Sequence, residues 1–107
     1  MSSRAIVSMP KEAKRGEVLE IKTLAQHPME TGYRRTQEGK VIERNIIRTF
    51  VCTYNGAEVF RMELHPTIAA NPFIAFTTLA TESGTLEFRW SGDNGYTVTE
   101  SARITVV

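Results

Sequence analysis

The dipeptide Asn55-Gly56 lies between two apolar runs, and it constrains the fold of this 107-residue chain more than any other feature. Asparagine followed by glycine supplies the two positive φ angles that a type I′ turn needs. The stretch from Asn45 to Leu64 is therefore predicted to form a β-hairpin with these two residues as its loop. A hairpin at the centre of the chain favours an antiparallel β fold.

Regular pairing outward from this turn divides the hairpin into two faces. One face is nearly all apolar and is expected to point into a core: Ile47, Thr49, Val51, Phe60, Met62 and Leu64. The other face should meet water but carries an aromatic cluster, which predicts a partner-binding surface. Its candidate contact residues are Phe50, Cys52, Tyr54, Val59 and Arg61. A slip of one residue would exchange the two faces, so this prediction depends on the turn.

Alternating or apolar runs predict further strands on both sides of the hairpin. They cover Arg4 to Met9, Glu17 to Ala25, Phe73 to Ala80, Thr85 to Ser91 and Tyr96 to Val106. The run from Phe73 is apolar in both phases, which predicts a strand near the middle of the packed structure. About seven short strands, with turn signals between them and no convincing helix, predict an all-β fold: one antiparallel β-sandwich domain spanning residues 1–107.

The segment Gly92-Asp93-Asn94-Gly95 predicts a second hairpin. A two-residue loop here would turn Val98 toward solvent. A three-residue loop with Gly95 in the left-handed conformation instead pairs Trp90 with Val98. The three-residue loop is preferred because it keeps Val98 in the core.

The stretch from Gln26 to Arg44 is polar and has no sustained period, so it is predicted to be a long excursion with at best a short strand near Thr31 to Arg35. Loops of this length in small domains are usually functional or disordered. The residues Tyr33-Arg34-Arg35 make it locally basic. Two interpretations stay open: a solvated loop whose charge nearby glutamates offset, or a patch that docks an anion or a protein.

Composition sets bounds on the function classes. Apolar residues make up 41% and charged residues 23% of the chain, as in an ordinary soluble domain, and the formal net charge is +1. This balance predicts neither nucleic-acid binding nor attachment to an acidic membrane. No apolar run approaches the length of a membrane span. The N-terminus has no apolar segment of a signal peptide, which by itself favours the cytoplasm.

No pattern predicts catalysis, a metal ion or a cofactor. His27 and His65 both precede proline and match no zinc spacing, so they are expected to hydrogen-bond at loop entrances. Cys52 is the one cysteine, and its apolar neighbours should raise the pKa of its thiol. A packing or interface role for Cys52 is preferred over the alternative, a thiol-dependent enzyme or redox sensor. A self-associating adhesion-type sandwich is a further option.

Three stretches of the chain resemble one family, SoxZ, a subunit of the SoxYZ sulfur-carrier complex of bacterial thiosulfate oxidation. They run from Lys14 to Arg35, from Arg48 to Phe73 and from Ala80 to Trp90, and the combination of HPMETGYRR with HPTIAANPF is specific. The resemblance implies an immunoglobulin-like β-sandwich without enzymatic activity. It also implies a heterodimer with SoxY, whose mobile arm holds the sulfur intermediate on a cysteine. This chain ends in ARITVV, without cysteine or glycine, and is expected to be the scaffold for that arm.

The resemblance further implies the periplasm, reached by export with SoxY, and transient contacts with other Sox enzymes. Under this interpretation the aromatic face of the central hairpin contributes to the SoxY interface. The long excursion supplies a second hypothesis, a docking loop for the Sox enzymes. Its candidate residues are His27, Met29, Glu30, Tyr33, Arg34 and Arg35.

Overall fold

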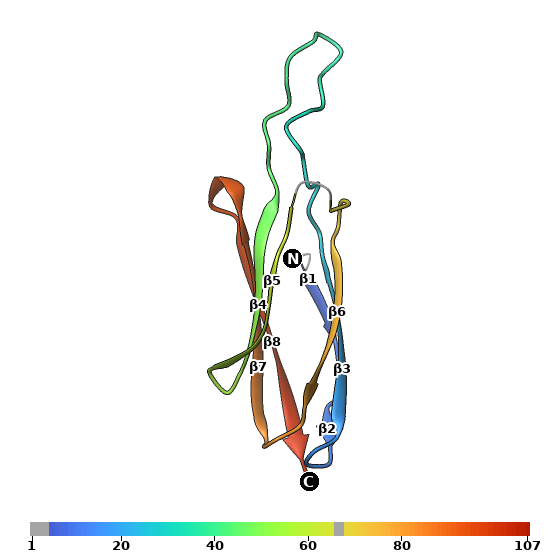
Figure 1. Cartoon of the computed structure of the whole chain (residues 1–107), viewed down its shortest axis with the longest axis vertical. Coiled ribbons are helices and arrows are strands. Elements are labelled where there is room, and N and C mark those ends of the chain that lie inside the picture. Colours follow the sequence, from blue (N-terminus) through green and yellow to red (C-terminus); the bar gives the residue numbers. More distant parts are fainter. Residues whose placement is uncertain (1–4, 66–67) are drawn as a thin grey trace.

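The computed structural model describes residues 5–65 and 68–107 and forms two β-sheets that face each other (Figure 1). The first sheet has the order β1-β3-β6 and the second the order β2-β8-β7-β4-β5. The strands are β1 (Ala5–Ser8), β2 (Glu12–Ala13), β3 (Val18–Ala25), β4 (Ile47–Tyr54), β5 (Ala57–Glu63), β6 (Phe73–Leu79), β7 (Gly84–Gly92) and β8 (Thr97–Val106).

The predicted all-β sandwich is confirmed, with eight strands among the described residues instead of about seven. The additional strand is β2, which lies between the first two predicted strands. It is two residues long and pairs in parallel with the end of β8, so its sequence is too short to show a period. The predicted start of the first strand, Arg4, lies outside the described residues.

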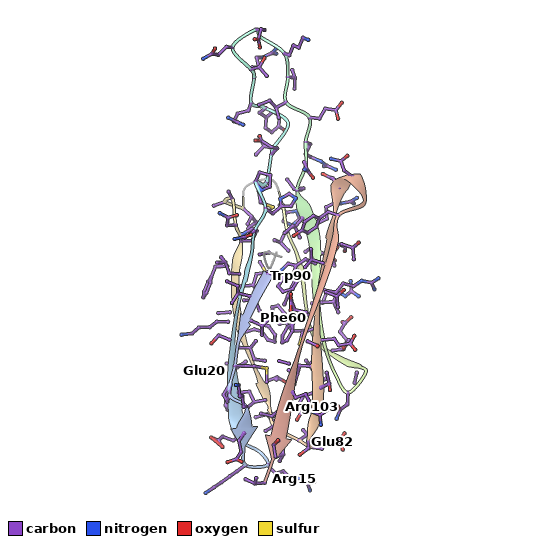
Figure 2. The ribbon with its side chains drawn as sticks, turned by 180° about the vertical axis from the view of Figure 1, so that it is seen from behind. Arg15, Glu20, Phe60, Glu82, Trp90 and Arg103 are labelled. Carbon is purple, nitrogen blue, oxygen red and sulfur yellow. The ribbon has the colours of Figure 1, made fainter. Side chains whose placement is uncertain are left out.

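Side chains from both sheets meet in a core built around the ring of Phe50. This ring lies 5.0 Å from Trp90, 5.9 Å from Phe76 and 6.0 Å from Phe60, measured between ring centroids. Leu86, Phe88 and Trp90 of β7 all point inward, as the alternation in that strand predicted. Figure 2 shows Trp90 and Phe60 between the sheets, whereas Glu20 points away from them.

The second hairpin has the predicted register. Trp90 pairs with Val98, and the Gly92 N–H donates to the Tyr96 carbonyl across the three residues Asp93–Gly95. Gly95 has a φ of 71°, as the three-residue loop requires. The prediction succeeded because only this loop length keeps Val98 buried.

The central hairpin has the predicted turn but a different register beyond it. Asn55 and Gly56 have φ angles of 49° and 85°, and Tyr54 pairs with Ala57. Thr53 then pairs with Glu58, but Cys52 pairs with Phe60, so Val59 is an extra residue in a β-bulge. The apolar residues of β5 therefore share a face with Phe50 and Cys52, and not with Val51.

The predicted faces of β4 are consequently exchanged. Phe50 and Cys52 have no exposed surface and Tyr54 is 4% exposed, so the residues expected to meet a partner lie in the core. Val51 and Thr53 point outward instead. A second irregularity, between Ile47 and Thr49, interrupts the alternation of buried and outward-facing residues. For this reason Ile47 is buried on the same side as Phe50 and Cys52. The prediction was wrong because a regular ladder was assumed where two irregularities occur.

The expected position of the strand from Phe73 was also wrong. β6 pairs with β3 on one side only and is an edge strand of its sheet. Its even-numbered residues Ile74 and Phe76 are buried in the core, whereas its odd-numbered residues are exposed. In this strand, one of the two largely apolar sets of residues faces the core and the other lies on the surface.

The segment between β3 and β4, residues 26–46, forms an arm that projects beyond the end of the sandwich (Figure 1). Two isolated bridges join its outgoing and returning halves, Glu30 with Asn45 and Arg35 with Val41. No strand forms at the predicted position near Thr31 to Arg35, where a single bridge residue lies. Among the described residues, no helix is long and apolar enough to cross a membrane.

Candidate functional site

The surroundings of Cys52 make it a structural residue. It is fully buried on β4, between β5 and β7, and burial raises the pKa of its thiol to about 12. Such a thiol stays protonated at neutral pH, and the thiol is a far weaker nucleophile than the thiolate. This observation agrees with the predicted direction of the pKa shift and counts against the alternative of a thiol enzyme.

Tyr54 has its own structural partners. Its hydroxyl donates to the Glu82 carbonyl and accepts hydrogen bonds from the Thr81 and Glu82 N–H groups at 3.3 Å. The next residue, Asn55, accepts a hydrogen bond from the Thr85 N–H at 2.9 Å. These hydrogen bonds hold the end of β4 against the turn before β7, at the end of the sandwich opposite the arm. The Tyr54 hydroxyl is therefore not available to a partner protein.

The outer face of the larger sheet is polar. Val59 and Arg61, the two remaining residues of the predicted partner-binding surface, are exposed on β5. Arg61 forms ion pairs with Glu58 at 2.9 Å and with Glu63 at 3.9 Å. A hollow of about 440 Å³ beside it is lined by Val51, Thr53, Arg61, Glu87, Arg89 and Thr99. Its mixed charges are typical of a solvated sheet surface.

The outer face of the smaller sheet is different, because apolar side chains lie at both ends of it. Ile6 pairs with Leu24 and Leu24 with Phe73 at one end, and Val18 pairs with Leu79 at the other. The exposed fractions are 55% for Ile6, 57% for Val18, 62% for Phe73 and 53% for Leu79. The exposed charged residues Glu20 and Lys22 of β3 lie between them, so the four residues form two small apolar patches at opposite ends of this face.

A groove of about 520 Å³ continues this surface onto the flank of the sandwich. It lies between the two edge strands β5 and β6, and its apolar walls include Val18, Val59 and Leu79. Behind it, the rings of Phe60 and Phe76 stack at 4.3 Å between centroids and close the core. The groove is therefore a surface feature between two strand edges.

The base of the arm is rigidly attached to the sandwich. His27 Nδ1 accepts the Met29 N–H at 2.9 Å, and Met29 Sδ accepts the Ile47 N–H at 3.2 Å. Both side chains are about 95% buried, so they anchor the arm. The prediction that they contact a docking enzyme does not agree with this burial. Burial lowers the pKa of His27, although the Asn45 side chain and the Asp93 carboxylate oppose this shift.

The returning half of the arm is fixed by Asp93 of the second hairpin. Its carboxylate accepts two hydrogen bonds from Arg44, at 2.9 and 3.1 Å, and one from the Ile46 N–H at 3.2 Å. These contacts hold the pKa of Asp93 below its usual range against the effect of desolvation. A Cβ at Gly92 would lie 2.2 Å from the Ile46 carbonyl oxygen, so glycine is needed for this close approach.

The other predicted docking residues lie on the exposed part of the arm. Tyr33 is 86% exposed, Arg34 forms an ion pair with Glu30 at 2.7 Å, and Arg35 donates to the Gly39 carbonyl at 3.1 Å. The structure thus divides the predicted docking loop into a buried base and an exposed tip. This division could not be predicted from the sequence, because the burial of His27 and Met29 depends on contacts with distant parts of the chain.

The described residues contain no group of three or more His, Cys, Asp or Glu placed to hold a metal ion. The features that the chain does present are sheet faces, strand edges and an arm. Fold and surface together define a two-sheet, mostly antiparallel β-sandwich protein.

The family model of the sulphur oxidation protein SoxZ matches residues 7–103, and the chain belongs to this family. It is therefore a Sox protein of sulfur oxidation. No protein among the curated sequences matches the chain.

Solved structures similar to this chain include a superoxide reductase (neelaredoxin) from Ignicoccus hospitalis, with 16% identity over 98% of this chain and 81% of that one and a TM-score of 0.72. A putative superoxide reductase from Thermotoga maritima has 18% identity over 96% and 85%, also with a TM-score of 0.72. The sulfur carrier protein SoxY from Chlorobium limicola f thiosulfatophilum has 11% identity over 99% and 81%, with a TM-score of 0.67. At these identities the likeness shows the fold alone.

Proposed function

We propose that this chain is a non-catalytic subunit that binds SoxY, the carrier of covalently bound sulfur intermediates, and helps to present it to the Sox enzymes during thiosulfate oxidation. The observation that carries this proposal is the family match over residues 7–103. The burial of Cys52 supports it, because the one thiol of the chain is kept away from sulfur chemistry. The chain then contributes a rigid surface, and the chemistry takes place on the mobile arm of SoxY.

The test is to mix the purified chain with SoxY of the same organism and to measure the mass of the product by size exclusion with light scattering. A 1:1 heterodimer with a dissociation constant below about 1 µM is expected for an interface of standard size, about 1,600 Å² in total. Two separate species at 50 µM of each protein would contradict the proposal. Turnover of a sulfur compound by the chain alone would contradict its non-catalytic part.

We place the complex in the periplasm, where the resemblance to SoxZ implies that it acts after export together with SoxY. Fractionation of cells that make both proteins tests this assignment. The chain should be found in the periplasmic fraction when SoxY is present and should remain in the cytoplasm when the signal of SoxY is deleted.

For the arm we propose transient docking of the Sox enzymes through its exposed tip, with Tyr33, Arg34 and Arg35 as contacts. The projection of the arm and the 86% exposure of Tyr33 support this role. The double variant Arg34→Glu with Arg35→Glu should slow the turnover of loaded SoxYZ, most strongly at low salt, and leave the heterodimer intact. The matched control Arg15→Glu with Arg103→Glu makes the same charge change on the sandwich, and it should leave turnover unchanged. Equal rates for both double variants would refute the docking role.

A further inference from the structure

The free edge of β6 presents unpaired main-chain groups in a defined register. The Ala25 N–H donates to the Pro72 carbonyl and the Ala80 N–H donates to the Glu17 carbonyl. Hydrogen-bonded pairs alternate along an antiparallel ladder, so the even-numbered residues of β6 bond to β3. The odd-numbered residues direct their N–H and C=O groups to the other side, where no further strand lies among the described residues. These residues are Phe73, Ala75, Thr77 and Leu79.

Exposed strand edges are usually protected against pairing with another chain, and the other edges of this sandwich show such protection. β1 is four residues long and β2 is two residues long. β5 has the bulge at Val59 and carries Glu58, Arg61 and Glu63.

β6 has none of these protective features. Its sequence FIAFTTL contains no charge and no proline, and its register with β3 is regular from Phe73 to Leu79. A regular, uncharged, largely apolar edge of seven residues is the arrangement that a strand from another chain pairs with.

The surfaces on both sides of this edge are suited to the side chains of an added strand. On the outer side lie the exposed residues Phe73 and Leu79, and on the inner side lies the groove between β5 and β6. Alternate side chains of an added strand would point to these two sides. The strand that fits is therefore extended, uncharged and apolar in both phases.

We propose that the edge of β6 pairs with an edge strand of SoxY, so that the three-stranded sheet continues into the partner. This inference rests on the proposed function and adds the surface through which it is carried out. SoxY is the occupant because a protein with the same two-sheet fold as this chain brings edge strands of its own. Edge pairing alone buries less than the roughly 800 Å² per partner of a stable complex. The neighbouring apolar residues Val18, Phe73 and Leu79 are therefore covered as well.

The experiment compares two proline variants, Thr77→Pro on β6 and Arg61→Pro on β5. Each variant removes one backbone N–H that faces a free edge. On β5, the Leu64 N–H donates to the Arg48 carbonyl, and bonded pairs alternate along the ladder, so the Arg61 N–H points away from β4. Proline is tolerated at such edge positions. Affinity for purified SoxY is measured by titration calorimetry. Thr77→Pro should weaken binding at least 100-fold, whereas Arg61→Pro should change it less than threefold.

Each possible outcome decides between the alternatives. If the wild type binds SoxY and Thr77→Pro binds equally well, the β6 assignment is wrong while the proposed function stands. If the wild type does not bind SoxY, the proposed function itself fails. If Thr77→Pro abolishes self-association of the chain and leaves SoxY binding intact, a second copy is the occupant and the proposal is overturned. If either proline variant loses its β signature in circular dichroism, two lysine variants replace them: Thr77→Lys on β6 and the control Thr99→Lys on the outer face of the other sheet. Thr77→Lys should then weaken SoxY binding and Thr99→Lys should not, and equal affinities would contradict the β6 assignment.

Discussion

The two edge strands on one flank of the sandwich, β5 and β6, differ in what they offer to other proteins. Both are seven residues long, and the stacked rings of Phe60 and Phe76 join them. β5 is bulged and carries three charged side chains, whereas β6 is regular and carries none. This difference is the basis of the proposal that β6 pairs with another chain, whereas the charged and bulged β5 stays in contact with solvent.

The largest effect is expected where the two edges meet. Phe60→Ala removes the ring that stacks on Phe76 and should lower the free energy of unfolding by about 2–3 kcal/mol, less than for a fully buried phenylalanine because Phe60 is partly exposed. Chemical denaturation measures the change. The neighbouring variant Val59→Ala, in the bulge, is the control and should cost less than about 1 kcal/mol. Similar losses for the two variants would show that the edges are not joined through this stack.

A second effect concerns Cys52, the buried residue of β4 that pairs with Phe60 of β5. The folded thiol of Cys52 keeps its proton up to about pH 12, whereas the unfolded thiol loses it near its ordinary value of 9.0. The unfolded state therefore binds fewer protons above pH 9, and the unfolding free energy should fall as the pH rises from there. Denaturation curves between pH 8 and 10 test this, with Cys52→Ala as the control that removes the contribution. Alkylation of native Cys52 at pH 8 as fast as that of a free thiol would contradict its burial.

The smallest effect is expected on the surface of β5. Arg61→Gln removes ion pairs with Glu58 and Glu63, all exposed, and should change stability by less than about 1 kcal/mol. Affinity for SoxY should also remain unchanged. A loss of SoxY binding tenfold or more in Arg61→Gln, with Thr77→Lys unaffected, would move the interface from β6 to β5.

The same comparison explains how far the sequence could predict the fold. Asn55-Gly56 identified the turn, and the burial of Val98 selected the right loop in the second hairpin. The bulge at Val59 left no sequence signal, because an extra residue in a strand resembles a regular one until its partner strand is known. That one residue exchanged the faces of β4 relative to β5 and placed three of the five predicted contact residues, Phe50, Cys52 and Tyr54, in the core.

The apolar run of β6 was visible in the sequence, but it predicted a strand in the middle of the structure, whereas β6 is an edge strand. A strand apolar in both phases can be buried on both faces or can have one face in the core and one against a partner. Sequence spacing does not distinguish these cases, since the distinction depends on the order of strands in the sheet. For the arm, the sequence predicted the exposed basic residues. The burial of His27 depends on Tyr96 and Asn71, and Met29 contacts Ile47 at the start of β4.

Amide hydrogen exchange, followed residue by residue in the free chain and in the complex with SoxY, tests the central claim most directly. The N–H groups of Ala75 and Thr77 should exchange quickly in the free chain and at least 100-fold more slowly in the complex, because pairing gives them acceptors. Those of Arg61 and Glu63 on β5 should exchange at the same rate in both. Protection of the β5 amides or of the arm, with Ala75 and Thr77 still exchanging quickly, would contradict the account.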